Sequence, residues 1–245
     1  MKVAVLGATR GMGRALARRM AERGDQLFLL GRDLRDLEKS ARDLEVRRGE
    51  GRVGAFVCDL ERPEGFAAAL DAAEAELEGL DTVVVTAGLF ATQDQLEADP
   101  ELARRLLLVD FTNTVTFCEA ARVRLLARGG GTLCVFSSVA GERGRKPVVL
   151  YGAAKAGLTR YLEGLDHKWR GAGLRTVCVK PGFVKTSMTD GLPVPPFAGE
   201  PDAVAATVLR AIDRGTPVVY APPIWRLVMW VIRNLPRAVM RRLQF

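Results

Sequence analysis

Residues 2–13 read KVAVLGATRGMG, and they predict the fold class of the whole chain. An apolar run of strand length at residues 2–6 is followed by a helical pattern at about residues 12–23. Glycines between the two let backbone N–H groups approach a pyrophosphate, which also gains from the positive N-terminus of the helix. We therefore expect a dinucleotide-binding turn formed by Gly7, Thr9, Arg10, Gly11, Met12 and Gly13.

Strand-like and helical patterns alternate along the rest of the chain, without a linker or an internal repeat. The expected strands cover residues 2–6, 26–30, 53–57, 82–85, 132–136, 175–179 and 218–220. The helical patterns lie at about residues 12–23, 34–48, 63–77, 99–128, 149–171 and 201–214. This alternation predicts an α/β fold of the Rossmann type, a doubly wound parallel sheet of about seven strands with helices on both faces. We assign residues 1–221 to a dinucleotide-binding catalytic domain and residues 222–245 to a helical extension of it.

Length and composition fit one large domain. The chain has 245 residues, of which 48% are hydrophobic, enough for one continuous core. The spacing of its four cysteines suits neither a metal site nor a redox pair, so we expect buried thiols and no metal. The chain opens on a strand rather than a signal peptide, and no apolar run reaches the roughly 20 residues that span a bilayer. We expect a cytoplasmic protein that does not bind nucleic acid.

A second stretch, CVFSSVAGERGRKPVVLYGAAKAGL at residues 134–158, carries the groups expected to do chemistry. A strand ends at Ser138, a loop follows, and a helix then carries Tyr151 and Lys155 on one face. A free tyrosine has a pKa of about 10, and a neighbouring ammonium lowers that pKa by favouring the phenolate. With the Ser138 hydroxyl, this predicts a proton-relay site for carbonyl/alcohol chemistry. The alternative is that Tyr151 is a surface aromatic and Lys155 a solvated charge.

The serine, tyrosine and lysine together with the glycine turn resemble the short-chain dehydrogenase/reductase (SDR) family, over nearly the whole chain. The resemblance implies an NAD(P)(H)-dependent oxidoreductase in which Tyr151 is the acid/base, Ser138 polarises the carbonyl and Lys155 holds the cofactor ribose. It implies a fourth catalytic position at Asp110, where V-D-F-T-N departs from the usual asparagine. The aspartate charge would favour a protonated lysine. The implied cofactor contacts beyond the glycine turn are Asp59, Leu60, Ala87, Gly88, Tyr151, Lys155, Pro181, Gly182, Val184 and Thr186.

Some of these positions have a structural alternative or depart from the family pattern. Asp59 would hold the adenine amino group, or it would cap a helix starting near Pro63. Thr86 stands where the family usually has asparagine, and Leu6 stands where it has threonine or serine. Thr86 and Asp110 support an alternative function, a membrane-associated scaffold that binds the cofactor without turnover.

The end of the second strand predicts the choice of cofactor. An NAD-specific fold usually has an acid there to accept the ribose 2′-hydroxyl, and Gly31 occupies that place. Arg32 and Arg10 can both face a 2′-phosphate, since guanidinium pairs strongly with phosphate. We therefore favour NADP(H) over NAD(H). Asp33 leaves two other interpretations open, as the ribose ligand beside solvated arginines or as the cap of the next helix.

Residues 221–245, APPIWRLVMWVIRNLPRAVMRRLQF, contain five arginines and no acid. Apolar residues at 225 and 227–232 surround most of a helix, and Pro236 should divide the segment into two short helices. This pattern suits peripheral membrane contact or a cover over a lipid-like substrate. The alternative is a helix that packs on the domain or in a dimer contact. Residues 187–200, rich in Gly, Pro and Met, are expected to form a mobile lid.

The stretches at residues 137–158 and 181–188 and the tail are similar to one SDR branch, the reductases of decaprenylphosphoryl-2-keto-pentose. This similarity implies an amphiphilic carbonyl or alcohol substrate at the inner face of a membrane, and it implies NADH, in conflict with Gly31 and Arg32. The family resemblance also implies a homo-oligomer that pairs through the helices near residues 99–128 and 149–171. A second alternative is an SDR that acts on a small soluble ketone and uses its tail as an oligomer contact.

Overall fold

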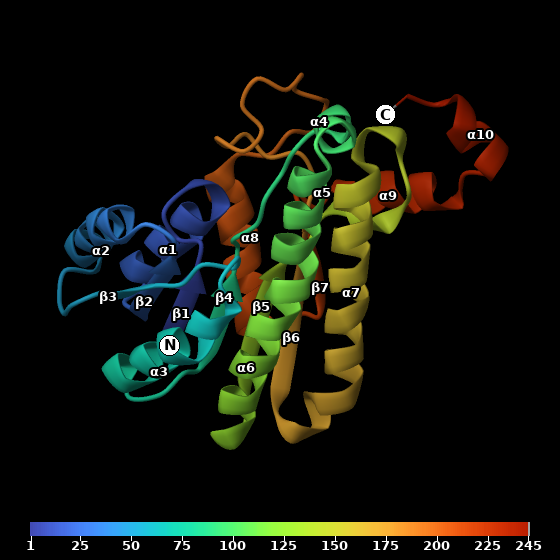
Figure 1. Cartoon of the computed structure of the whole chain (residues 1–245). Helices are drawn as coiled ribbons and strands as arrows, with labels where there is room; N and C mark the ends of the chain where they lie inside the picture. The colour runs from blue at the N-terminus through green and yellow to red at the C-terminus, as the bar shows by residue number, and fades with distance from the viewer. Residues whose placement is uncertain (245) are drawn as a thin grey trace.

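The computed structural model describes residues 1–244 and confirms the Rossmann arrangement (Figure 1). The strands are β1 (Lys2–Leu6), β2 (Gln26–Gly31), β3 (Gly54–Val57), β4 (Thr82–Val85), β5 (Gly131–Phe136), β6 (Leu174–Pro181) and β7 (Val218–Ala221). The helices are α1 (Gly11–Glu22), α2 (Leu34–Arg48), α3 (Phe66–Leu77), α4 (Gln93–Ala98), α5 (Pro100–Leu107), α6 (Asn113–Ala127), α7 (Val149–Trp169), α8 (Pro201–Arg214), α9 (Trp225–Asn234) and α10 (Arg237–Arg242).

The seven strands of the described chain are all parallel, in the order β3-β2-β1-β4-β5-β6-β7. Their carboxyl ends therefore meet along one edge of the sheet. The chain reverses its winding between β1 and β4, the place where open α/β sheets bind their ligands. The topology alone directs attention to the loops after these two strands.

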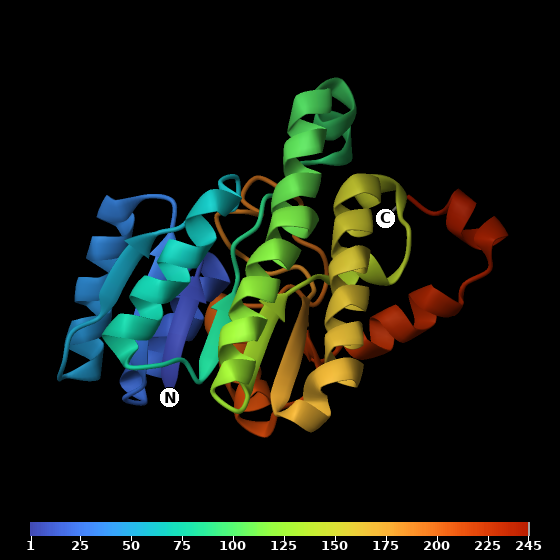
Figure 2. The same cartoon turned by 60° about the horizontal axis from the view of Figure 1, so that its bottom comes forward.

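Alternate residues of each central strand face opposite layers of helices. On β1, Val3 and Val5 pack with α1, α2 and α8, whereas Ala4 and Leu6 pack with α3, α6 and α7. Figures 1 and 2 show these two layers on either side of the sheet. Because both faces are covered, the strands are apolar at nearly every position and appear in the sequence as short apolar runs. The four cysteines are buried free thiols, as the sequence predicted.

The helical pattern predicted over residues 99–128 is not one helix. α5 ends at Leu107, a π-helical turn covers Leu108–Thr112, and α6 then begins. The prediction also missed α4, which a Thr92–Gln95 capping box starts. Helix propensity does not distinguish the wider π turn from an α turn, so the sequence pattern concealed the interruption. Such turns occur frequently at functional sites.

The segment between β6 and α8 lies over the carboxyl ends of the strands, at the top of Figure 1. An isolated bridge between Val184 and Gly199 joins its two ends. The Lys185 N–H donates to the Gly199 carbonyl oxygen at 3.0 Å, and the Gly199 N–H donates to the Phe183 carbonyl oxygen at 2.8 Å. The segment is therefore a closed loop with fixed ends.

The tail forms two short helices that separate at Leu235 and Pro236, as the proline predicted. Figures 1 and 2 show α9 beside the β7 edge of the sheet and α10 projecting away from the main body of the domain. None of the helices in residues 1–244 is long and apolar enough to cross a membrane.

Candidate active site

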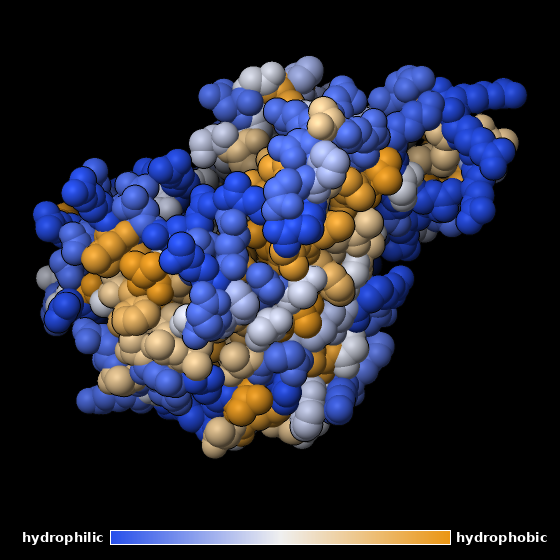
Figure 3. Space-filling view, viewed as in Figure 1, coloured by the Kyte–Doolittle hydropathy of each residue, from blue (hydrophilic) through white to orange (hydrophobic). Residues whose placement is uncertain are grey.

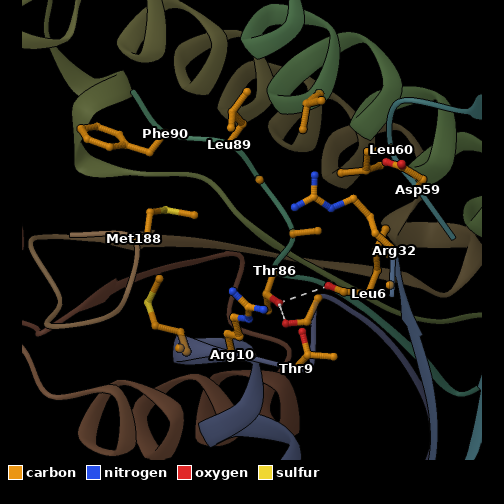
Figure 4. A pocket seen from close by; sticks show the side chains of 18 of the residues that line it. Leu6, Thr9, Arg10, Arg32, Asp59, Leu60, Thr86, Leu89, Phe90 and Met188 are labelled. Atoms are coloured by element: carbon orange, nitrogen blue, oxygen red, sulfur yellow. Dashed lines mark hydrogen bonds between the residues drawn. The ribbon is translucent and has the colours of Figure 1, made fainter. Parts of the chain in front are cut away.

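The turn between β1 and α1 leaves no room for two side chains. Gly7 has a φ of +97°, which favours glycine, and a Cβ there would lie 2.6 Å from the Ala87 nitrogen. A Cβ on Gly13 would lie 2.2 Å from the Gly7 carbonyl oxygen. The Thr86 hydroxyl lies between the ends of β1 and β4 and shares its hydrogen bonding between the carbonyl oxygens of Leu6 (3.1 Å) and Gly7 (3.0 Å), as Figure 4 shows. The unusual threonine therefore supports the turn.

A cavity of about 470 Å³ lies at the carboxyl ends of β1, β2 and β4. The predicted cofactor contacts that line it are Gly7, Thr9, Arg10, Gly11, Met12, Gly13, Arg32, Asp59, Leu60, Ala87, Gly88 and Thr186. The predicted contacts outside this lining are Tyr151, Lys155, Pro181, Gly182 and Val184. The cavity thus collects the glycine turn, the ends of three strands and the first residues of the loop over them.

Asp33 lies outside the cavity lining, whereas Gly31 and Arg32 belong to it. The Asp33 carboxylate accepts the backbone N–H of Asp36 at 3.0 Å and caps α2. Of the sequence interpretations of Asp33, the structure therefore supports the helix cap. The end of β2 presents no acid at the place where Gly31 stands.

Arg32 and Arg10 line the same cavity but have different partners. Figure 4 shows the Arg32 side chain extending into the cavity, and this side chain is 67% exposed. Its closest acid is Glu61, at 3.7 Å, and Glu61 makes a shorter contact of 2.6 Å with Arg105. Arg10 pairs with Asp36 at 2.9 Å. Arg32 is therefore the less engaged of the two guanidinium groups.

Asp59 directs its carboxylate at its own chain. The carboxylate accepts the backbone N–H of Glu61 at 3.0 Å. The alternative role of Asp59, as the cap of a helix near Pro63, is wrong, because Arg62 precedes that short 3₁₀ turn and no side chain caps it. The side chain of Leu60 is buried in the core, so this residue offers the cavity its backbone.

β5 and α7 bring Ser138, Tyr151 and Lys155 to the same end of the sheet. Ser138 follows β5 directly, and its Oγ accepts the N–H of Ala140 at 3.1 Å. Ser137 ties the strand to the helix by donating from Oγ to the Lys155 carbonyl oxygen at 2.9 Å. The Lys155 ammonium lies 5.5 Å from the centre of the Tyr151 ring. The i, i+4 pair predicted from the sequence is therefore a contact.

The π-helical turn directs Asp110 at the same lysine. Its Oδ2 lies 3.4 Å from Lys155 Nζ, and its Oδ1 accepts the N–H of Leu89 at 2.7 Å. Both side chains are buried, with Asp110 0% and Lys155 4% exposed. A Cβ on Gly88 would lie 3.0 Å from Asp110 Oδ1, so the absence of a side chain there keeps the ion pair uncrowded. The side-chain carboxylate of Asp110 is therefore the group that lies next to the Lys155 ammonium.

The loop after β6 connects the tail to the glycine turn. Pro181 ends the strand, and Gly182 lies beneath Trp225, where a Cβ would stand 2.1 Å from the indole nitrogen. The Val184 side chain is buried in the core, so its backbone is what it can offer to a cofactor. Thr186 Cγ2 would lie 3.3 Å from a Cβ on the middle glycine of the turn. The loop therefore covers the turn from above.

The family of the chain follows from comparison with known proteins. The model of the family described as short chain dehydrogenase matches residues 1–193. The chain is also 36% identical over 245 residues to an uncharacterized oxidoreductase of Streptomyces coelicolor, covering 98% of this chain and 94% of that one. This chain belongs to the short-chain dehydrogenase/reductase family.

One further relative supports the same family, and one solved structure supports the fold. The cis-4-hydroxycyclohexanecarboxylate dehydrogenase of Sinomonas cyclohexanicum is 32% identical over 192 residues, covering 77% of this chain and 75% of that one. A solved short-chain type dehydrogenase/reductase from Mycobacterium ulcerans superposes with a TM-score of 0.81 at 21% identity, covering 89% of this chain and 86% of that one. The protein is accordingly an SDR oxidoreductase of the alcohol/carbonyl class that uses NAD(P).

The residues of this SDR fit a dinucleotide. Gly7, Gly11 and Gly13 line the cavity without side chains, so backbone N–H groups of the turn can approach phosphate oxygens there. Gly11, Met12 and Gly13 are the first residues of α1, whose N-terminus attracts negative charge. The cavity continues past Arg32 and Asp59 on one side and Gly88 on the other. These residues would hold the cofactor's phosphates and adenosine.

The acid–base state of the SDR site differs from the sequence prediction. Burial raises the pKa of Tyr151 and the Asp110 carboxylate adds to this, while Lys155 and the Ser138 hydroxyl lower it without prevailing. The sequence predicts a net lowering by Lys155, and the difference arises mainly because the phenol is buried, while the nearby Asp110 carboxylate offsets part of the ammonium charge. Burial lowers the pKa of Lys155, but Asp110 and Tyr151 raise it beyond its ordinary value. The site therefore holds a protonated phenol beside a protonated lysine.

Sequence reasoning missed two residues that position Tyr151. Phe90 lines the cavity and contacts the Tyr151 ring edge to face, with centres 5.1 Å apart. Gln93 of α4 accepts the backbone N–H groups of Val149 (2.9 Å) and Leu150 (3.2 Å), which begin α7. No pattern around Gln93 announces this role, because the helix that it caps begins 56 residues later. The one signal that the sequence carries here is the Thr92–Gln95 capping box, which predicts the start of α4 but not the contact of Gln93 with α7.

A buried ion pair next to the site was also missed. Glu142, four residues after Ser138, pairs with Lys180 at the end of β6 and with Arg233 of α9, the latter at 2.9 Å. The side chains of Glu142 and Lys180 are 5% and 8% exposed. Burial raises the pKa of Glu142, but Lys180 and Arg233 lower it below its usual value. The carboxylate therefore links the serine loop to the tail.

Proposed function

We propose that this SDR is an NADPH-dependent ketoreductase that converts a ketone into a secondary alcohol. One observation carries the proposal. The groups of Ser138, Tyr151 and Lys155 converge at the carboxyl ends of the strands, beyond a cavity framed by the glycine turn. Bound NADPH supplies the hydride, and the remainder of the step depends on side chains of this chain.

Tyr151 donates the proton that the carbonyl oxygen receives. Its raised pKa keeps the phenol protonated at neutral pH, which is the form a proton donor needs. Ser138 binds the same oxygen with its hydroxyl and holds the carbonyl in place. Lys155 stabilises the negative charge that develops on the phenol as the proton leaves. For oxidation of an alcohol, Tyr151 must instead start as the phenolate and accept the hydroxyl proton, while the protonated Lys155 stabilises that phenolate.

The alternative function, a scaffold without turnover, rests on Thr86 and Asp110. Thr86 binds two carbonyl oxygens that shape the glycine turn. Asp110 forms a buried pair with Lys155 and keeps it protonated. Both departures from the family pattern are thus compatible with catalysis, and neither removes a proton donor. We therefore favour the enzyme over the scaffold.

The preference for NADPH is supported by the end of β2. Gly31 offers no carboxylate to a ribose 2′-hydroxyl, and Asp33 is committed to capping α2. Arg32 extends into the cavity with only a 3.7 Å contact to Glu61. A guanidinium in this state is available to a 2′-phosphate, which it can bind through two parallel N–H groups.

Replacing Arg32 with alanine is expected to weaken NADPH binding about tenfold or more, because a hydrogen bond to a charged group contributes about 1.5–3 kcal/mol. NADH, which lacks the 2′-phosphate, should lose little. The measurement is the Kd of each cofactor from protein fluorescence titration. Arg35→Ala, an exposed arginine of α2 outside the cavity lining, is the matched control. Equal losses for both cofactors, or tighter wild-type binding of NADH, would refute the NADPH assignment.

We further propose that the ketone belongs to an amphiphilic molecule, such as a polyprenyl-phosphate keto-sugar. The loop over the site exposes apolar side chains, with Met188, Val194 and Phe197 44%, 60% and 59% exposed. Met188 also lines the cavity. The similarity to the keto-pentose reductase branch over residues 137–245 points to the same class. A small soluble ketone is the competing substrate class. Two other expectations from the sequence, that the protein forms a homo-oligomer and that it is cytoplasmic, stay predictions.

A pair of keto-sugar phosphates with the same ring, one with a prenyl chain and one without, tests both proposals. Single-turnover loss of NADPH fluorescence should be at least tenfold faster with the prenyl chain, because its apolar surface gains about 25 cal/mol per Å² buried. Equal rates would remove the amphiphilic class and leave the ketoreductase. No oxidation of bound NADPH by any ketone of a broad panel would favour the scaffold.

A further inference from the structure

The inner face of α9 is already occupied by the domain. Trp225, Met229 and Ile232 are buried together with Val139, which follows the active-site serine, and the partly buried Phe183 of the loop after β6 packs against them. The packing alternative for the tail therefore holds for this face. These contacts fix the direction in which the rest of the helix points.

The outer face of α9 consists of Leu227, Trp230 and Val231, and all three are exposed. Their exposed fractions are 60%, 60% and 47%, and Ile224, just before the helix, is 40% exposed. Successive residues turn by about 100° in an α-helix, so these side chains point away from the buried ones. Large apolar side chains gathered on one exposed face mark an interaction surface.

The charges beside this outer face are all positive. Among residues 222–244 the charged side chains are Arg226, Arg233, Arg237, Arg241 and Arg242. Arg233 pairs with Glu142, and within residues 1–244 the other four form no ion pair. Figure 3 shows hydrophilic side chains over most of the projecting end of the molecule, around a smaller apolar group. Such a surface is complementary to negative charge next to an apolar layer.

We propose that the outer face of α9, with the arginines of α10, binds the surface of a bilayer that contains anionic lipids. Tryptophan favours the lipid–water boundary, and arginines are attracted to anionic headgroups. α9 has 10 residues and is therefore about 15 Å long, half of the roughly 30 Å of a bilayer core. The helix therefore lies in the interface plane.

A second copy of this chain is a poorer occupant of the same face. In a two-fold dimer the same patch meets itself, so the arginines of one copy would face the arginines of the other. Negative headgroups remove this repulsion, and the lipid chains accept the apolar side chains. The charge pattern thus favours a membrane over self-association.

Membrane contact would reach the active site through the inner face of the same helix. The Trp225 indole N–H donates to the Phe197 carbonyl oxygen at 3.2 Å, and Phe197 belongs to the loop over the cavity. Gly199 of that loop would meet Pro222 of the tail at 2.9 Å if it carried a Cβ. A bilayer bound to α9 therefore adjoins the loop through which an amphiphilic ketone would enter; this step rests on the proposed function.

Flotation of the full chain with vesicles tests the surface independently of catalysis. The wild type should float with vesicles of phosphatidylcholine and phosphatidylglycerol and stay behind with phosphatidylcholine alone. The double variant Leu227→Ser/Trp230→Ser should bind the vesicles about tenfold or more weakly, since it removes two apolar side chains that the bilayer would bury. Arg237→Gln/Arg241→Gln/Arg242→Gln should bind on the order of a hundredfold more weakly to the anionic vesicles.

Val46→Ser on α2 is the matched control, because Val46 is an apolar helix residue that is 84% exposed far from the tail in sequence. It should float like the wild type, and all variants should keep the wild-type thermal unfolding midpoint. A wild type that does not float, or a Leu227→Ser/Trp230→Ser variant that floats equally well, would overturn the proposal. If the wild type does not float and the Leu227→Ser/Trp230→Ser variant dissociates an oligomer, the outer face of α9 is a contact between copies of the chain. Neither result would affect the ketoreductase proposal.

Discussion

Tyr151→Phe is expected to reduce turnover by about a hundredfold or more, because a positioned general acid contributes about 10²–10⁴-fold to a rate. The phenol is the group that the site offers to the carbonyl oxygen, with Ser138 and Lys155 beside it. NADPH binding should persist, since Tyr151 lies outside the lining of the cavity. Single-turnover kinetics and a cofactor titration measure the two effects separately.

Tyr161→Phe provides the matched control on the same helix. The Tyr161 hydroxyl donates to Glu119 Oε1 at 2.8 Å, outside the site, so its removal should leave turnover nearly unchanged. If Tyr151→Phe retained near-normal turnover, the proton would have another source and the assignment of Tyr151 would be wrong. If both variants lost turnover equally, the loss would reflect a disturbed α7 rather than a missing acid.

Asp110→Ala is expected to lower the free energy of unfolding by about 3–5 kcal/mol, because it leaves a buried lysine without its partner. The variant also deprives the Leu89 N–H of its acceptor. Urea unfolding measures the change. Asp110→Asn should lose less, since its amide oxygen can still accept that N–H. An alanine variant as stable as the wild type would show that the pair does not hold the site together.

The same asparagine variant tests the electrostatics of Tyr151. The Asp110 carboxylate raises the pKa of the phenol, so its neutralisation should lower that pKa. Oxidation of an alcohol requires the phenolate, which would then form at a lower pH. The acidic limb of the pH profile for oxidation should therefore move toward lower pH in Asp110→Asn. An unmoved limb, or one displaced toward higher pH, would contradict the role given to Asp110.

The sheet, the glycine turn and the division of the tail followed from the sequence. Each depends on a short-range property: apolar runs of strand length, glycines where Gly7 and Gly13 must avoid other atoms, and a proline that cannot continue a helix. The sequence also predicted the site residues Ser138, Tyr151 and Lys155, because they lie at one strand end and on one turn of the following helix. These features need no knowledge of distant neighbours.

Only the tertiary structure decided what surrounds these residues. Asp110 reaches Lys155 because a π-helical turn interrupts the expected helix, and Gln93 caps a helix that begins 56 residues later. Trp225 contacts Gly182 and the loop over the site, so the tail is partly a packing element. The pKa of Tyr151 is raised instead of lowered, because burial and the carboxylate of Asp110, far away in the sequence but close in space, outweigh the neighbouring ammonium. Burial and charge separation depend on packing across the whole fold, which spacing along the chain does not encode.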